Sequence, residues 1–119
     1  MGKSYRDLVV WNKAMELVTN IYRLTQTFPR EEIFGLMSQL RRSAVSIPSN
    51  IAEGQGRLSK GEFRVFLGNA RGSLAELETQ ILIAQGLDYL KEPDAAGLLD
   101  QAAEIGRTLN GLIASTKKQ

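Results

Sequence analysis

Apolar residues recur at alternating steps of four and three from position 63 to position 84, and this spacing constrains the fold more than any other feature. The residues are Phe63, Leu67, Ala70, Leu74, Leu77, Ile81 and Ala84. Such a repeat places its members on one helical face, the packed seam of coiled-coil-like bundles. About 27 residues at roughly 1.5 Å each predict a helix on the order of 40 Å long, which would run the length of a bundle.

Three further segments show helical apolar spacing, and no segment shows the period-two alternation expected of a β-strand. The first extends from Val10 to Phe28, the second lies on both sides of Pro48, and the last is expected to start at Pro93. Short loops between long helices are typical of up-down-up-down bundles. The sequence therefore predicts an all-α fold, an antiparallel up-down-up-down four-helix bundle with a proline-kinked second helix.

Pro48 predicts the kink because its ring crowds the carbonyl of Ala44 and because proline lacks the backbone donor that this carbonyl needs. We expect the second helix to start at residues 29–32, where a proline is followed by carboxylates that favour a helix N-terminus. Gly54 and Gly56 are expected to end it in positive-φ conformations.

Gly68 and Gly72 lie one helical turn apart on the third helix. We expect this pair of small residues to let another helix backbone approach closely near the proline bend. Asn69 or Arg71 would then donate a hydrogen bond to the freed carbonyl.

The chain has 119 residues, 15 Lys and Arg, 13 Asp and Glu, and no Cys or His. This length suits one domain over residues 1–119, with disordered ends expected at 1–4 and 116–119. Without Cys and His, thiolate nucleophiles, imidazole catalysis and the commonest metal ligands are excluded, so we expect no enzyme, metal or cofactor. No signal segment or membrane-length apolar run is present, so we expect a cytoplasmic protein with no membrane contact.

Basic residues gather around the expected junction of the second and third helices. Between Gly35 and Ala75, six basic and two acidic residues give a net charge of +4. Arg57, Lys60 and Arg64 fall at the exposed tip of this helical hairpin, so they are candidate contacts for RNA or DNA phosphates.

Arg41 and Arg42 belong to the same basic cluster but allow two interpretations. They lie within a helical turn of Glu76 and Glu78 on the expected partner helix, so they can form interhelical ion pairs, the interpretation that we favour. Alternatively, both arginines remain available to a partner.

A second apolar stripe on the first helix, formed by Trp11, Met15, Val18 and Tyr22, needs a cover of its own. A weaker second edge on the fourth helix comprises Leu99, Gly106 and Ile113. We therefore expect self-association through the first and fourth helices. The alternative is a monomer with a thick core around the aromatic residues of the first helix.

Five motifs occur in order along nearly the whole chain, from Tyr5 to about Ile113. They are YRDLVVW at 5–11, FPREE at 28–32, QLRRS at 39–43, SIPSNIAEGQGR at 46–57 and ARGSLAELET at 70–79. In these motifs the chain resembles the 23S rRNA intervening-sequence proteins, also called four helix bundle proteins. More distantly, it is similar in architecture to the accessory variability proteins of diversity-generating retroelements.

The resemblance implies a bacterial antiparallel bundle that assembles as a ring, with a homopentamer favoured, and it brings no catalytic residues. The accessory variability proteins form pentameric barrels that bind nucleic acid and a reverse transcriptase, an analogy at the level of the fold. We therefore expect a non-enzymatic oligomer that binds RNA or DNA through basic surface residues. The alternative is a scaffold ring that binds another protein and has no nucleic-acid role.

Overall fold

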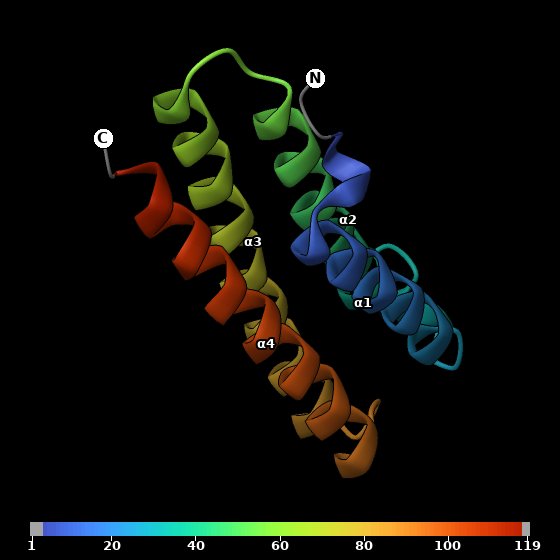
Figure 1. Cartoon of the computed structure of the whole chain (residues 1–119). Helices are drawn as coiled ribbons and strands as arrows, with labels where there is room; N and C mark the ends of the chain where they lie inside the picture. Colours follow the sequence, from blue (N-terminus) through green and yellow to red (C-terminus); the bar gives the residue numbers. More distant parts are fainter. Residues whose placement is uncertain (1–3, 118–119) are drawn as a thin grey trace.

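The computed structural model describes residues 4–117, and within this range it contains helices and no β-strand. The four long helices are α1 (Val9–Thr25), α2 (Leu36–Gln55), α3 (Lys60–Gly86) and α4 (Glu92–Thr116). Short 3-10 helices, η1 (Tyr5–Asp7) and η2 (Arg30–Glu32), precede α1 and α2. Figure 1 shows the chain reversing direction at each loop, so that the helices form an elongated bundle of 48 × 22 × 20 Å. The predicted all-α, four-helix fold is confirmed.

Each helix packs against two neighbours, and the diagonal pairs α1–α3 and α2–α4 make no comparable contact. The predicted seam of α3 forms part of one continuous apolar core, in which Leu67, Leu77 and Ile81 are fully buried. Burial stabilises the fold by about 1.5–3 kcal/mol for each large aliphatic side chain. Phe63, at the start of the seam, is only half-buried.

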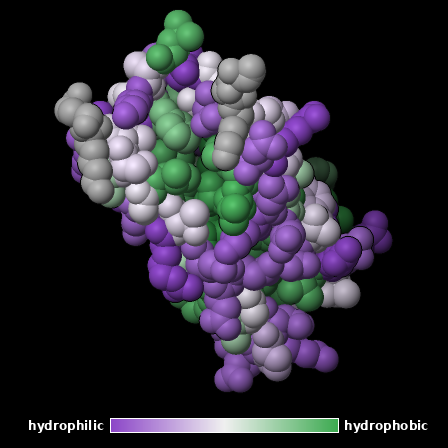
Figure 2. All heavy atoms as spheres, viewed as in Figure 1, coloured by the Kyte–Doolittle hydropathy of each residue, from purple (hydrophilic) through white to green (hydrophobic). Residues whose placement is uncertain are grey.

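The interfaces between neighbouring helices differ in extent. The α2–α3 interface is the most extensive and the α1–α4 interface is the least extensive. In Figure 2, apolar surface gathers in a hollow below the α2–α3 loop, between the end of α4 and the start of α1. Leu58 in this loop is fully exposed.

Helix α2 starts at Leu36, and the prediction that it starts at residues 29–32 is wrong. Gly35 has φ −112° and ψ −115°, which separates η2 from α2. The predicted helix-start carboxylates act from the preceding turn instead, because Oε1 of Glu32 accepts a hydrogen bond from the backbone N–H of Leu36 at 2.8 Å. This bond satisfies one of the free donors at the α2 N-terminus. Oε2 of Glu32 accepts a second bond, from the Tyr89 hydroxyl at 3.1 Å.

Helix α2 continues through Pro48 to Gln55, and the bend at the proline stays a prediction. Close approach to α3 occurs at Gly54: a Cβ placed there would lie 2.7 Å from the Cβ of Phe66. The expectation of close packing at Gly68 and Gly72 is wrong, since a Cβ on either would meet no atom within 4 Å.

The predicted donors on α3 have other surroundings. Arg71 donates a hydrogen bond to Oδ1 of Asn110 on α4 at 3.0 Å, and Asn69 is exposed. Neither is bonded to the carbonyl of Ala44 in the described residues.

Helix ends also differ from the glycine-based prediction, because no glycine in residues 4–117 has positive φ. Gly56 has φ −80°, and its N–H bonds to the carbonyls of the last turn of α2. The left-handed residue is Asp88, with φ 63°, just after α3. The N–H groups of Asp88 and Tyr89 donate to the carbonyls of Gln85 and Ala84 at 3.0 and 2.9 Å, the pattern of a Schellman motif.

Both ends of the chain were predicted to be disordered, but some of their residues lie in or next to helices. Ser4 caps η1, with its hydroxyl accepting from the N–H of Arg6 at 2.9 Å. Thr116 is the last residue of α4 and is buried. Residues 1–3 and 118–119 lie outside the described residues. Within residues 4–117, no helix combines the length and apolarity needed to cross a membrane.

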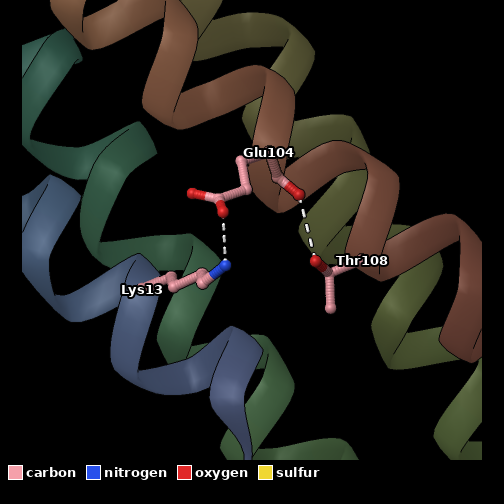
Figure 3. A network of polar contacts seen from close by, with 3 residues as sticks. All are labelled: Lys13, Glu104 and Thr108. Carbon is pink, nitrogen blue, oxygen red and sulfur yellow. Dashed lines mark hydrogen bonds and ion pairs between the residues drawn. The ribbon is translucent and has the colours of Figure 1, made fainter.

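Two polar contacts connect α1 to α4. Lys13 forms an ion pair with Glu104, as Figure 3 shows, and Nδ2 of Asn20 donates to Oε1 of Gln101 at 3.0 Å. The Thr108 hydroxyl in the same view donates to the backbone carbonyl of Glu104 at 3.0 Å. The hydrogen bond from Lys13, followed by its charge, lowers the pKa of the Glu104 carboxyl below its ordinary value of 4.5.

Candidate nucleic-acid interface

The three predicted phosphate contacts lie together at the α2–α3 tip, and one of them already has protein partners. Arg57 forms an ion pair with Glu53 at 2.8 Å, and its guanidinium lies 4.7 Å from the centre of the Phe66 ring. Lys60 is exposed at the first position of α3, and Arg64 is half-buried one turn later. Neither of these two forms an ion pair within residues 4–117. Arg57 therefore also contacts Glu53 and Phe66, whereas Lys60 and Arg64 form no ion pair within residues 4–117, and all three stay predicted phosphate contacts.

Three further cations extend this positive surface along α3 and α4. The bond from Arg71 to Asn110 aligns the two helices. Residues seven apart share a helical face, so Arg64 and Lys117 lie about two turns from this pair, toward the α2–α3 loop. Arg107 lies one turn from Asn110 in the opposite direction. We call Lys60, Arg64, Arg71, Arg107 and Lys117 the basic half of the α3–α4 hairpin.

The rest of the same hairpin has the opposite charge. Between positions 76 and 104 it carries seven acidic side chains, opposed by Lys91 alone. These are Glu76, Glu78, Asp88, Glu92, Asp94, Asp100 and Glu104, which we call the acidic half. In the basic half, Glu62 is the one acidic residue, and its carboxylate accepts a hydrogen bond from the Ser59 hydroxyl at 3.2 Å. Charge is therefore separated along the length of the bundle.

Sequence analysis missed this separation because it counted charges along the second and third helices and not across the third and fourth. Arg107 and Lys117 lie far along the chain from Arg64 and Arg71. The available signal was the absence of any acidic residue after Glu104.

Neither Arg41 nor Arg42 forms the favoured ion pair with the glutamates of α3 in the described residues. Nε of Arg41 donates to Oγ1 of Thr25 at 2.9 Å, and its NH2 group donates to the carbonyl of Tyr22 at 3.2 Å. Its guanidinium also lies 4.4 Å from the Tyr22 ring centre. Arg41 therefore binds the negative end of the α1 dipole. Arg42 is exposed and lies on a cleft between α2 and α3.

An apolar groove of about 540 Å³ lies between α1 and α2. Trp11, Met15 and Val18 of the second stripe line its α1 side, and Val45, Pro48 and Ala52 line its α2 side. The side chains of Met15 and Val45 are 41% and 40% exposed. We call this surface the α1–α2 groove.

The stripe on α1 is thus continued by α2 and not by α4. The predicted α4 edge is covered in the protomer, because Ile113 is 7% exposed and Leu99 packs against the core. The exposed apolar surface of the second stripe therefore borders the α1–α2 groove, and self-association through α1 and α4 stays a prediction.

Within residues 4–117, no group of three carboxylates comes close enough together to hold a metal ion. What the fold presents instead is a pair of surfaces, one polarised in charge and one apolar. The fold and these surfaces define a small helical-bundle protein.

The chain belongs to the 23S rRNA-intervening sequence protein family, whose model matches residues 6–111. The predicted resemblance is confirmed. A crystal structure of a protein of unknown function, from the S23 ribosomal protein family of Bacteroides thetaiotaomicron VPI-5482, is similar with a TM-score of 0.82. The two sequences are 24% identical over 88% of this chain and 98% of the other, a likeness that shows the fold alone. No curated protein matches the sequence.

Proposed function

We propose that this chain is a non-enzymatic subunit of a homo-oligomer that binds RNA or DNA through the basic half of α3–α4. The observation that carries this proposal is the separation of charge: the basic half has five cations, while the acidic half of the same hairpin has seven carboxylates. A surface of this kind attracts the phosphate backbone at one end of the molecule and repels it at the other.

The exposed fractions of the cations support a phosphate contact. Arg71, Arg107, Lys60 and Lys117 are exposed, so they can reach a backbone without displacing protein contacts in the core. An oligomer would repeat this positive surface in every subunit, which raises the total number of phosphates that one particle neutralises. A pentameric ring is the assembly that the family resemblance favours.

The double variant Lys60→Glu, Arg64→Glu tests this proposal. Affinity for a structured RNA hairpin, measured by fluorescence anisotropy from about 50 to 200 mM salt, should fall, and its salt dependence should weaken. Each lost phosphate contact is expected to reduce the slope of log K against log salt by about 0.7–0.9.

The matched control is Arg23→Glu, Lys91→Glu, which makes the same charge change away from the basic half. This control should retain the affinity and the salt slope of the unmodified protein. Equal affinity of the tip variant and the unmodified protein across the salt series would contradict the proposal.

A protein-binding scaffold is the second candidate, in which the α1–α2 groove holds a partner protein in place of a second copy of this chain. Met15 and Val45 expose apolar surface next to a groove large enough for partner side chains. After nuclease treatment, the unmodified protein should then retain one partner protein in stoichiometric amount, and a Met15→Lys variant should lose it. Retention of that partner by the variant would reject the groove as its site.

A further inference from the structure

A polar cleft of about 440 Å³ lies between α2 and α3, on a different face of α2 from the apolar groove. This volume is within the range of about 300–1,000 Å³ that is typical of small-molecule sites. Its lining residues are Gln39, Arg42, Ser43, Ser46, Glu76 and Gln80. None of them belongs to the basic half of α3–α4.

Most polar groups of this cleft have no partner within residues 4–117. The Oε1 atom of Gln80 is buried without a hydrogen-bond donor, and the residue as a whole is 6% exposed. Ser43 is 5% exposed, and its hydroxyl makes no hydrogen bond in the described residues. Ser46 is the exception, since its hydroxyl pairs with that of Ser73 at 2.8 Å. Burying an unpaired acceptor destabilises a protein, and a turn of the Gln80 amide toward the cleft would let Oε1 accept a hydrogen bond from a ligand.

Two opposite charges face the same cleft from different helices. Arg42 comes from α2 and Glu76 comes from α3, and neither forms an ion pair with any described residue. The two charges of the cleft therefore cancel, with the guanidinium on the α2 wall and the carboxylate on the α3 wall. Glu76 disfavours a bare phosphate, and the polar lining disfavours an apolar ligand. The ligand must be nearly neutral, with hydrogen-bond acceptors on one edge and donors on another.

We propose that this cleft binds a guanine base. The O6 and N7 atoms of guanine are two adjacent acceptors that match the paired donors of an arginine such as Arg42. On its other edge, N1–H and the exocyclic amino group are donors that match the carboxylate of Glu76 and the Oε1 atom of Gln80. Adenine lacks the N1–H donor, so it leaves one of these acceptors unpaired.

The base can come from a free guanine nucleotide or from an unstacked guanine in RNA, since protein sites read unstacked bases along both edges. The assignment does not depend on the phosphate contacts proposed above, because it uses different residues on a different face.

Titrations with GMP, AMP and ribose 5-phosphate test the assignment. Calorimetry measures the affinities, and backbone amide NMR shows which residues respond. GMP should bind at least about tenfold more tightly than AMP and should shift the amide signals around Ser43 and Gln80. Ribose 5-phosphate should not bind, because it lacks the base. Equal affinity for GMP and AMP, or no binding of GMP, would overturn the proposal.

The variant Glu76→Gln removes the carboxylate at nearly constant volume and should reduce the preference for GMP by about tenfold or more. Glu78→Gln is the matched control on α3, since Glu78 lies outside the cleft lining. Matching thermal melts of both variants would establish that the fold is intact. A preference for GMP that survives in Glu76→Gln would count against the assignment.

A further comparison distinguishes a free nucleotide from RNA as the source of the guanine base. It measures the affinity for a single-stranded RNA with one guanine and for the same strand with adenine at that position. Tighter binding of the guanine strand than of GMP assigns the cleft to RNA, and equal or weaker binding assigns it to the free nucleotide. The Lys60→Glu, Arg64→Glu variant should retain GMP binding, so failure of the phosphate contacts and failure of the guanine cleft are separable.

Discussion

At the scale of single residues, Gly54 determines how closely α2 and α3 can pack. A Cβ at this position would lie 2.7 Å from the Cβ of Phe66 and 3.0 Å from Cδ1 of Phe63. Rotation of a side chain does not move the Cβ atom of Phe66, so α3 itself would have to move to relieve this contact. The absence of a side chain at Gly54 therefore sets the interhelical distance at the tip.

Replacement of Gly54 by Ala should destabilise the protein by about 1–3 kcal/mol, because the added methyl group overpacks the α2–α3 interface. Gly72→Ala is the matched control, since a Cβ there meets no atom within 4 Å. The control should stabilise the protein by about 0.5–1 kcal/mol through helix propensity. Chemical denaturation measures both values. A Gly54→Ala variant as stable as the control would show that no close contact exists.

Side-chain partners were the least predictable feature at this scale. Spacing along the sequence located Lys60 and Arg64 near a helix junction, but Arg57 stacks on Phe66 because of the helical register in three dimensions. Arg41 likewise binds the end of α1, where its partner Thr25 is 16 residues away in the sequence. Such contacts depend on the rotation of each helix about its axis, which apolar spacing defines only approximately.

At the scale of elements, the Lys13–Glu104 ion pair connects α1 to α4 across the least extensive interface of the bundle. The hydrogen bond and the charge of Lys13 hold the pKa of Glu104 below 4.5 in the folded protein. The unfolded chain therefore takes up a proton at Glu104 at a higher pH than the folded protein does. The stabilisation is complete above the ordinary glutamate pKa and is lost as the pH falls through the lower, folded value.

Glu104→Gln should accordingly lower Tm slightly at neutral pH and leave it unchanged at a pH below the folded pKa of Glu104. The effect is small because both side chains are partly exposed. Glu16→Gln serves as the control, since Glu16 forms no ion pair in residues 4–117. Thermal melts at several pH values provide the measurement. A Tm difference that is the same at every pH would reject the linkage.

Elements with a strict apolar repeat were predicted best. The predicted length of the third helix is confirmed, since α3 has 27 residues, and its seven regularly spaced apolar positions define how the helix is rotated about its axis. The start of α2 was predicted too early, because Gly35 departs from helical geometry and the Glu32 carboxylate caps the helix from outside it. Local acidic residues next to a proline indicate a helix start but do not locate it.

At the scale of the whole molecule, the α1–α2 groove is the surface that we expect to mediate self-association. Val45→Lys places an ammonium group at the groove and should reduce the particle to a single protomer in light scattering. Leu82→Lys is the control, since Leu82 is 54% exposed on α3 and lies outside the groove. Dissociation caused by Leu82→Lys and not by Val45→Lys would place the interface on α3 instead.

Separated charge along the α3–α4 hairpin also gives each protomer a permanent dipole moment. In the field of a polyanion, a dipole experiences a torque, so the protomer would turn its cationic pole forward before any contact forms. In the proposed ring, rotational symmetry makes the axial components of these moments add, which produces two rims of opposite potential. Nucleic acid would then approach one rim only, and neighbouring rings would stack head to tail at low ionic strength.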